Sequence, residues 1–178
     1  WGLMLNAHIE RFGSPSPEQL AAVALKNHNN AKANPLAQLN LDISLEDILN
    51  SRIISWPTTM YECCPFSEGA TALILASESA TRSLGKTPIW MSGIGTSVDS
   101  ALPDMSSTGY GRLPAVYKSA QAAYTMARIG DPSTQLDVFE VHDLFSGLEI
   151  MAYEELGLCP LGEGGRLIDE GSVQKDGL

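Results

Sequence analysis

The chain has 178 residues, 44% hydrophobic and 18% charged, which is the balance of an ordinary globular protein with room for a sizeable core. Its formal net charge of −10 argues against nucleic acid as a general partner, because no basic excess is present to displace counterions. No apolar run reaches the ~18 residues of a membrane-spanning helix and no signal-peptide pattern is visible, so we expect neither feature. Three cysteines, two of them adjacent, cannot supply a disulfide framework and favour a reducing compartment.

The N-terminal part carries clear helix start and stop signals. A helix is predicted over residues 1–12, and Gly13 ends it. A second helix, over residues 17–31, follows the sequence Ser-Pro-Glu-Gln at 16–19. In that sequence the serine can cap, the proline fits the first helical position and the glutamine can bond back to the cap. A third, short helix is predicted to begin at residues 44–47.

Several apolar stretches predict strands. Residues 70–76 have a continuous apolar character that indicates a buried strand, and residues 89–95 are predicted to form the next strand. Residues 136–141 suit a short, largely buried strand. Residues 53–56 favour a strand or an extended edge that a proline ends. A short helix over residues 78–84 separates the first two of these stretches.

The C-terminal part predicts two further helices. A long helix over residues 114–128 has an alanine-rich face, which we expect to pack on a sheet that includes the strands at Ile89 and Val138. The next helix covers residues 144–156 and ends at a glycine. Two glycine-containing stretches predict irregular backbone, a loop at 103–111 and a flexible surface turn at 162–165.

His142 and Asp143 lie where the predicted strand turns into the last of these helices. Ligands of open α/β sheets bind at the carboxyl ends of the strands. A neutral imidazole at that place can donate an N–H to a carbonyl oxygen that becomes an oxyanion. From position alone, a histidine that bonds nearby backbone is the simpler interpretation. Asp143 would orient the histidine or support the turn rather than transfer a proton.

The cysteines are weaker candidates for chemistry. A catalytic thiolate needs a helix N-terminus or a paired histidine, and Cys63 and Cys64 instead precede a proline and a loop. Cys159 follows a helix end and is predicted to be a packing residue. His8 and His28 are predicted to lie on solvated helix faces.

Metal and nucleotide motifs are not recognisable in this sequence. The three histidines are widely separated and no Cys-x-x-Cys is present, so no metal site is expected. The pair Gly93 and Gly95 imitates the start of a dinucleotide fingerprint, but the third glycine and the acidic residue that should follow are missing.

Three segments resemble thiolases. Residues 140–145, Glu-Val-His-Asp-Leu-Phe, resemble the histidine variant of the family's Asn-Glu-Ala-Phe motif. Residues 60–75 are similar to the segment that reads Asp-Gly-Ala-Ala-Ala before a buried strand, and residues 18–28 are similar to a loop-domain helix. Order and spacing fit in all three, and together they cover nearly the whole chain. The resemblance is to the sterol-carrier, lipid-transfer and archaeal acetyl-CoA acetyltransferase branch.

The resemblance implies an α/β, thiolase-like fold of layered helices and sheets. Residues 1–86 would hold the loop-domain helices and the end of the N-terminal domain, and residues 87–178 the start of the C-terminal domain. The chain begins within a helical pattern without a methionine and stops in a polar stretch, so we expect a piece of a longer protein. The family's nucleophilic cysteine and its second catalytic histidine and cysteine would then lie outside it, and the piece alone would be inactive.

The resemblance further implies that the intact protein is an acyl-CoA C-acyltransferase that works through an acyl-cysteine and Claisen chemistry, with His142 in its oxyanion hole. Coenzyme A thioesters would be substrates. No covalently bound cofactor is implied, and no coenzyme A-binding residue is assigned. A homodimer in the cytoplasm, or in the peroxisome of a eukaryote, is expected.

Two alternatives remain open. One is a thiolase-fold retro-aldolase that works with an OB-fold, acyl-CoA-binding partner and uses tyrosine rather than cysteine. Tyr110 or Tyr153 can be mistaken for that tyrosine, and the sequence does not settle whether this alternative holds, because the position of the discriminating cysteine lies outside it. The other alternative is a non-catalytic protein that binds acyl-CoA or lipid.

Overall fold

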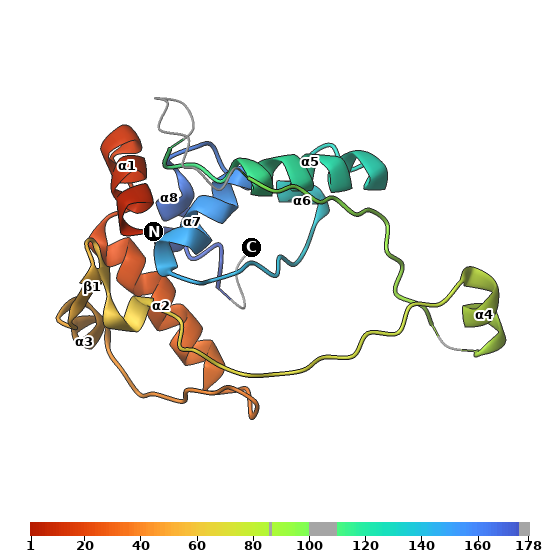
Figure 1. Cartoon of the computed structure of the whole chain (residues 1–178), viewed down its shortest axis with the longest axis horizontal. Coiled ribbons are helices and arrows are strands. Elements are labelled where there is room, and N and C mark those ends of the chain that lie inside the picture. Colours follow the sequence, from red (N-terminus) through yellow and green to blue (C-terminus); the bar gives the residue numbers. More distant parts are fainter. Residues whose placement is uncertain (86, 100–109, 175–178) are drawn as a thin grey trace.

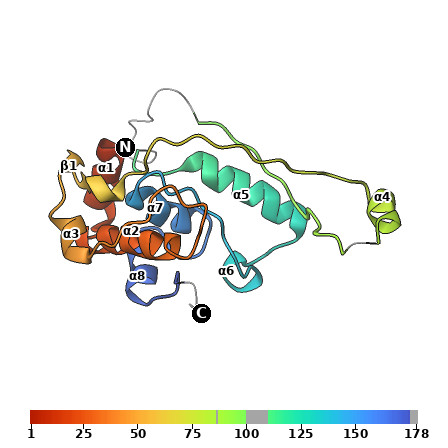
Figure 2. The same ribbon diagram turned by 90° about the horizontal axis from the view of Figure 1, so that it is seen from below.

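The computed structural model describes residues 1–85, 87–99 and 110–174. A helical body holds both ends of the described chain, and a long extended arm leaves it, carries one short helix at its tip, and returns (Figures 1 and 2). The elements in chain order are α1 (Gly2–Phe12), α2 (Pro17–Ala31), α3 (Leu45–Leu49), β1 (Ile53–Ser55), β2 (Thr58–Thr59), the 3₁₀ helix η1 (Met60–Glu62), α4 (Glu78–Ser83), α5 (Pro114–Ala127), α6 (Pro132–Gln135), α7 (Ser146–Glu155) and α8 (Gly164–Asp169).

The N-terminal helices form as their caps predict. Gly13 ends α1 with φ 74°, and its N–H donates to the carbonyl of Ile9 at 2.7 Å. At the start of α2, the N–H of Gln19 donates to Ser16 Oγ at 3.2 Å, and Gln19 Oε1 accepts from the Ser16 N–H at 2.9 Å. Both reciprocal bonds of a capping box are therefore present. The short helix α3 begins with a second capping box at Ser44.

The only sheet within the described ranges is the antiparallel pair of β1 and β2. It confirms the strand expected at residues 53–56. The strands predicted at 70–76, 89–95 and 136–141 are wrong, because these segments have no ladder bonds and none of their residues is fully buried. Ile74 and Ile89, for example, are 91% and 101% exposed. Their backbone is extended, but a strand needs a neighbouring strand to bond with, and none lies beside them in the described chain.

The predicted helix at 78–84 is confirmed as α4, at the tip of the arm (Figure 1). The loop predicted at 103–111 falls almost entirely outside the described residues. Among the described residues, no helix has both the length and the apolar character needed to span a membrane.

Helix α5 confirms the predicted long helix, but it does not pack on a sheet. The returning part of the arm lies against it instead. A Cβ on Gly93 would come within 2.3 Å of the Ala123 carbonyl oxygen, and one on Gly95 within 1.9 Å of the Ser119 carbonyl oxygen. Only glycine permits this close approach of the two backbones. The pair that imitates a dinucleotide fingerprint is therefore a packing feature.

The core is built around α7, which confirms the helix predicted at 144–156. Gly157 ends it with φ 80°. Ile150 and Met151 of α7 are buried together with Leu20 of α2 and Ile168 of α8. A smaller buried cluster joins α2 and α3 and consists of Ala21, Ala24 and Ile48. Every residue of α7 except the partly buried Leu148 is buried, so this helix has no solvated face.

Three glutamates of α7 are buried, and each has a partner. Glu154 lies 3.4 Å from Nε2 of His8, and its carboxylate accepts from the Gly164 N–H at 3.0 Å. Glu155 pairs with the guanidinium of Arg112. Glu149 pairs with a lysine of α2, described below. Buried carboxylates are tolerated only when paired in this way.

Two predictions fail at these contacts. His8 is 1% exposed rather than solvated, and its Nδ1 lies 2.8 Å from the Gly111 carbonyl oxygen. Its partners are more than a hundred residues away in the sequence, so no local pattern reveals them. The flexible turn at 162–165 is wrong in its second half, because Gly164 and Gly165 are buried at the start of α8. His28 is half-buried, with its ring edge-on to Tyr61.

Candidate functional site

The turn with His142 and Asp143 joins the extended segment 136–141 to the start of α7. The strand expected before it is absent, as described above. The turn is instead held by the segment after η1. The Cys64 N–H donates to the Leu144 carbonyl at 3.1 Å, and Cys63 forms an isolated antiparallel bridge with Phe145. The His142 side chain is exposed, while that of Asp143 points into the protein.

Asp143 belongs to a buried polar cluster between α2 and α7, which we call the α2–α7 cluster: Lys26, Asn27, Asp143, Glu149 and Tyr153. Asn27 Nδ2 donates to Asp143 Oδ2 at 2.6 Å and to Glu149 Oε2 at 2.7 Å. Lys26 Nζ donates to Asn27 Oδ1 at 2.6 Å and pairs with Glu149 Oε1 at 2.8 Å. The Tyr153 hydroxyl donates to Glu149. The cluster thus contains two carboxyl groups and one cation.

The electrostatics of this cluster raise the pKa of Asp143. Burial, and secondly the charge of Glu149, raise the pKa of Asp143 from 3.8 to about 6, against the opposing effect of the Asn27 hydrogen bond. Its other oxygen, Oδ1, is buried and has no hydrogen-bond partner. Burial and the neighbouring carboxylate of Glu149 also raise the pKa of Tyr153, which keeps its hydroxyl a donor.

A groove of about 250 Å³ opens beside Asp143, between α2 and the segment that follows η1. Its lining residues are Ala24, Asn27, His28, Ala31, Ala37, Gln38, Leu39, Tyr61, Glu62, Cys63, Cys64, Pro65 and Asp143. No lysine or arginine is among them, and burial raises the pKa of the Glu62 carboxyl. The groove therefore suits an apolar or neutral group better than a phosphate.

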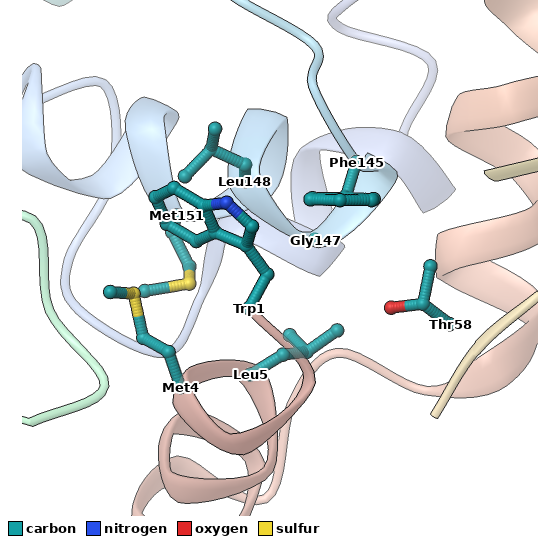
Figure 3. Close-up of a pocket in the computed structure, with 8 residues that line it drawn as sticks. All are labelled: Trp1, Met4, Leu5, Thr58, Phe145, Gly147, Leu148 and Met151. Atoms are coloured by element: carbon teal, nitrogen blue, oxygen red, sulfur yellow. The ribbon is translucent and has the colours of Figure 1, made fainter. Parts of the chain in front are cut away.

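A second recess lies where α1 meets the start of α7. Figure 3 shows Trp1 and Met4 facing Leu148 and Met151, with Phe145 beside them. Its volume is about 10 Å³, which is room for a single water-sized molecule. It is a packing contact that anchors the start of α7, directly after the His142 turn.

Cys159 is a packing residue, as predicted, and the bonding of Cys63 agrees with its being a weak candidate for a nucleophile. The Cys63 thiol donates to the Thr59 carbonyl, and burial and the charge of Glu62 raise its pKa. Burial raises the pKa of Cys159 to about 12, and its side chain packs against the main core. Cys64 is exposed. A raised pKa removes the thiolate that nucleophilic attack requires.

The two tyrosines considered for an aldolase differ in their burial. Tyr153 is 4% exposed and committed to Glu149, while Tyr110 is half-buried at the edge of a described range. Across residues 1–85, 87–99 and 110–174, no group of three or more histidine, cysteine or acidic side chains is arranged to hold a metal ion.

Sequence reasoning singled out His142 and Asp143 but missed Lys26, Asn27 and Glu149. The two α2 residues lie on a polar helix end and carry no signal of their own. Glu149 did carry a signal in the sequence, because it stands between the apolar residues Leu148 and Ile150, where a buried charged side chain needs a partner.

Comparisons with known proteins give consistent relatives. A family model described as "Thiolase C-terminal domain-like" matches residues 95–178. Acetyl-CoA acetyltransferase of Methanothermobacter thermautotrophicus is 34% identical over 180 residues, covering 99% of this chain and 45% of that protein. Sterol carrier protein 2 of Oryctolagus cuniculus is 34% identical over 168 residues, covering 92% of this chain and 30% of that protein.

A solved structure has the same fold over nearly the whole chain. It is described as "Ltp2-ChsH2(DUF35) aldolase", and it matches with a TM-score of 0.82 and 26% sequence identity. The match covers 99% of this chain and 46% of that one. The chain therefore spans less than half the length of each of these three proteins.

Proposed function

Because this chain belongs to the thiolase superfamily and has a thiolase-like fold, we propose that the intact protein is an acyl-CoA C-acyltransferase. The observation that carries the proposal is the 34% identity to an acetyl-CoA acetyltransferase, which extends over 99% of this chain. Its substrates are coenzyme A thioesters. A cysteine contributed from outside these 178 residues takes up the acyl group, and the carbon–carbon bond is made or broken by Claisen chemistry.

In this proposal His142 donates an N–H to a thioester oxygen that becomes negatively charged. Three observations support that role. The His142 side chain is exposed, its neighbour Asp143 is anchored by Asn27, and the groove beside them accepts an uncharged group. A fixed donor aimed at a developing oxyanion contributes more than a mobile one, since it need not reorganise during the reaction.

The acyl-cysteine must come from elsewhere, because this chain's own thiols are poorly placed. The pKa values of Cys63 and Cys159 are raised, which disfavours the thiolate. In this scheme coenzyme A thioesters bind as substrates, and the protein carries no covalently bound cofactor. A homodimer located in the cytoplasm, or in the peroxisome of a eukaryote, belongs to the same proposal.

The second candidate is a retro-aldolase that acts with an OB-fold partner. The observation in its favour is the solved structure described as an aldolase with a DUF35 component. The described part of the chain gives the tyrosine chemistry of this candidate less support, because Tyr153 is buried and bonded to Glu149. The name of the sterol carrier relative keeps a lipid-binding role as a third candidate.

Coenzyme A consumption separates these candidates. The full-length protein is incubated with acetoacetyl-CoA and free coenzyme A, and free thiol and acetyl-CoA are followed together. Acyl transfer consumes one coenzyme A for each bond cleaved, because the acyl group passes from the cysteine to coenzyme A. Without added coenzyme A the acylated cysteine accumulates, and mass spectrometry detects it. Cleavage of a 3-hydroxyacyl-CoA that consumes no coenzyme A would overturn the proposal in favour of the aldolase. The same conclusion would follow if this cleavage occurred only after an OB-fold partner is added. Binding without turnover of either substrate would favour the lipid-binding role.

A further inference from the structure

The α2–α7 cluster is the one place where α2 and α7 meet through polar side chains next to the proposed site. Lys26 and Glu149 are 9% and 3% exposed at the side chain, so their charges are almost fully removed from water. A buried ion pair is expensive to form and is often no better for stability than an apolar pair. Its position beside the His142 turn therefore calls for an explanation other than stability.

Asn27 has only one workable orientation in this cluster. Its Nδ2 group serves the carboxyl oxygens of Asp143 and Glu149 at once, and its Oδ1 accepts from Lys26. A flipped amide would turn its oxygen toward two carboxyl groups and lose all three bonds. The amide is therefore a fixed bridge between α2, α7 and the turn.

The bridge ends one residue from His142. Asp143 Oδ2 is held by Asn27, and the backbone of Leu144 is held by the Cys64 N–H. The turn is thus tied down on the side that follows His142, while the histidine side chain itself stays exposed. A side chain on a turn fixed in this way has fewer directions available to it.

We propose that Asn27 and Glu149 are positioning residues for His142, which act by holding the carboxyl group of Asp143 and with it the turn that carries the histidine. The inference rests on the proposed function. Neither residue touches the reacting atoms. Glu149 keeps Lys26 in place, Lys26 fixes the Asn27 amide, and the amide fixes Asp143.

The same arrangement makes the position of His142 depend on pH. The ionisable groups that interact with Asp143 are Lys26 from α2, Glu149 and Tyr153 from α7, Cys63 from the segment after η1, and its neighbour His142. Three further ionisable side chains line the same groove as Asp143: His28, Glu62 and Cys64. Asp143 binds the amide best as a carboxylate. Protonation below a pKa of about 6 weakens that bond and loosens the turn.

The kinetic test compares Asn27→Leu with Asn30→Leu in the full-length protein. Asn30 is an exposed asparagine on the same helix and serves as a matched control. For Asn27→Leu we expect kcat to fall about 10–100-fold with KM unchanged, because a small misplacement of a catalytic group costs that much. For Asn30→Leu neither constant should change. An unchanged kcat in Asn27→Leu would overturn the proposal.

A double-mutant cycle shows whether Asn27 acts through His142. In a His142→Ala background the Asn27→Leu change should cost nothing further, since the group that it positions is already gone. If the fold-reductions in kcat of the two single variants multiply fully in the double variant, the positioning role is overturned and the proposed function stays intact. If His142→Ala alone leaves kcat unchanged, the proposed role of His142 fails and the inference fails with it, whereas the acyltransferase activity itself is tested separately by coenzyme A consumption.

Glu149→Gln gives a second, nearly isosteric variant in case Asn27→Leu does not fold. It removes the negative charge that raises the pKa of Asp143, so the acidic limb of kcat against pH should move down. Asn27→Leu removes a donor that lowers this pKa, so its acidic limb should move up. A purely structural role would lower the melting temperature without these opposite shifts, and an unmoved acidic limb in Glu149→Gln would overturn the proposal.

Discussion

Replacing Asp143 by asparagine should make the protein more stable at neutral pH. At about 1.4 kcal/mol for each pKa unit, the rise from 3.8 to about 6 makes the ionised Asp143 cost about 3 kcal/mol of folding free energy. The folded state keeps the proton that the unfolded state has already released, so stability is present at low pH and is lost as pH rises through about 6. Asparagine cannot ionise, and its amide oxygen still accepts from Asn27.

Urea unfolding followed by circular dichroism, at about pH 4 and about pH 7.5, measures this effect. The free energy of unfolding of Asp143→Asn minus that of the wild type should rise by about 2.5 kcal/mol between the two conditions, because the unfolded carboxyl is already partly ionised at the lower pH. Asp131→Asn is the matched control with the opposite sign. The Asp131 pKa is lowered by its bonds to Ser133 and Thr134, so its removal should cost stability only toward neutral pH. A difference for Asp143→Asn that does not change with pH would refute the raised pKa of the Asp143 carboxyl.

Four further predictions concern the core, a buried carboxylate and the thiols. Ile150→Ala should destabilise by about 2–5 kcal/mol in urea unfolding, whereas Leu36→Ala, at a site 89% exposed, should stay within about 0.5 kcal/mol of the wild type. Glu155→Ala should cost about 3–5 kcal/mol, because it leaves a guanidinium without its carboxylate, and an unchanged midpoint would contradict the buried pair. The 178-residue chain alone should not cleave acetoacetyl-CoA, and thiolysis by this chain would contradict the assignment of the thiols. Iodoacetamide should label the exposed Cys64 well before Cys159, whose pKa is about 12, and the reverse labelling order would contradict that assignment too.

Helices with local caps could be predicted from sequence. The capping box of Ser16 and Gln19 and the terminating glycines Gly13 and Gly157 all act within one helical turn, so the residues that decide the outcome are neighbours in the sequence. The same holds for α3, α4 and α5, whose starts and stops lie near the predicted ones.

Features that depend on distant partners could not be predicted in this way. The segments at 70–76, 89–95 and 136–141 are apolar enough for buried strands, but strand pairing is set by other segments, and here they lie extended and largely exposed. His8 looks like a surface residue until Gly111 and Glu154 are brought to it by folding.

The candidate site was predicted in part. The His142–Asp143 turn before a helix is a local pattern, and the helix is present. The bridge from Asn27 to Asp143 joins residues 116 positions apart, so only the structure reveals it. Whether His142 takes part in chemistry stays a prediction that kinetics must test.

The central claim is tested most directly by the turnover of His142→Ala in the full-length protein. Loss of one oxyanion donor typically lowers kcat by about 10²–10³, so we expect that loss together with a melting temperature close to that of the wild type, since the side chain is exposed. His142→Asn, which restores an N–H donor, should recover part of the activity. A His142→Ala protein that turns over acyl-CoA at the wild-type rate, or one that unfolds while its folded fraction keeps full activity, would contradict the account.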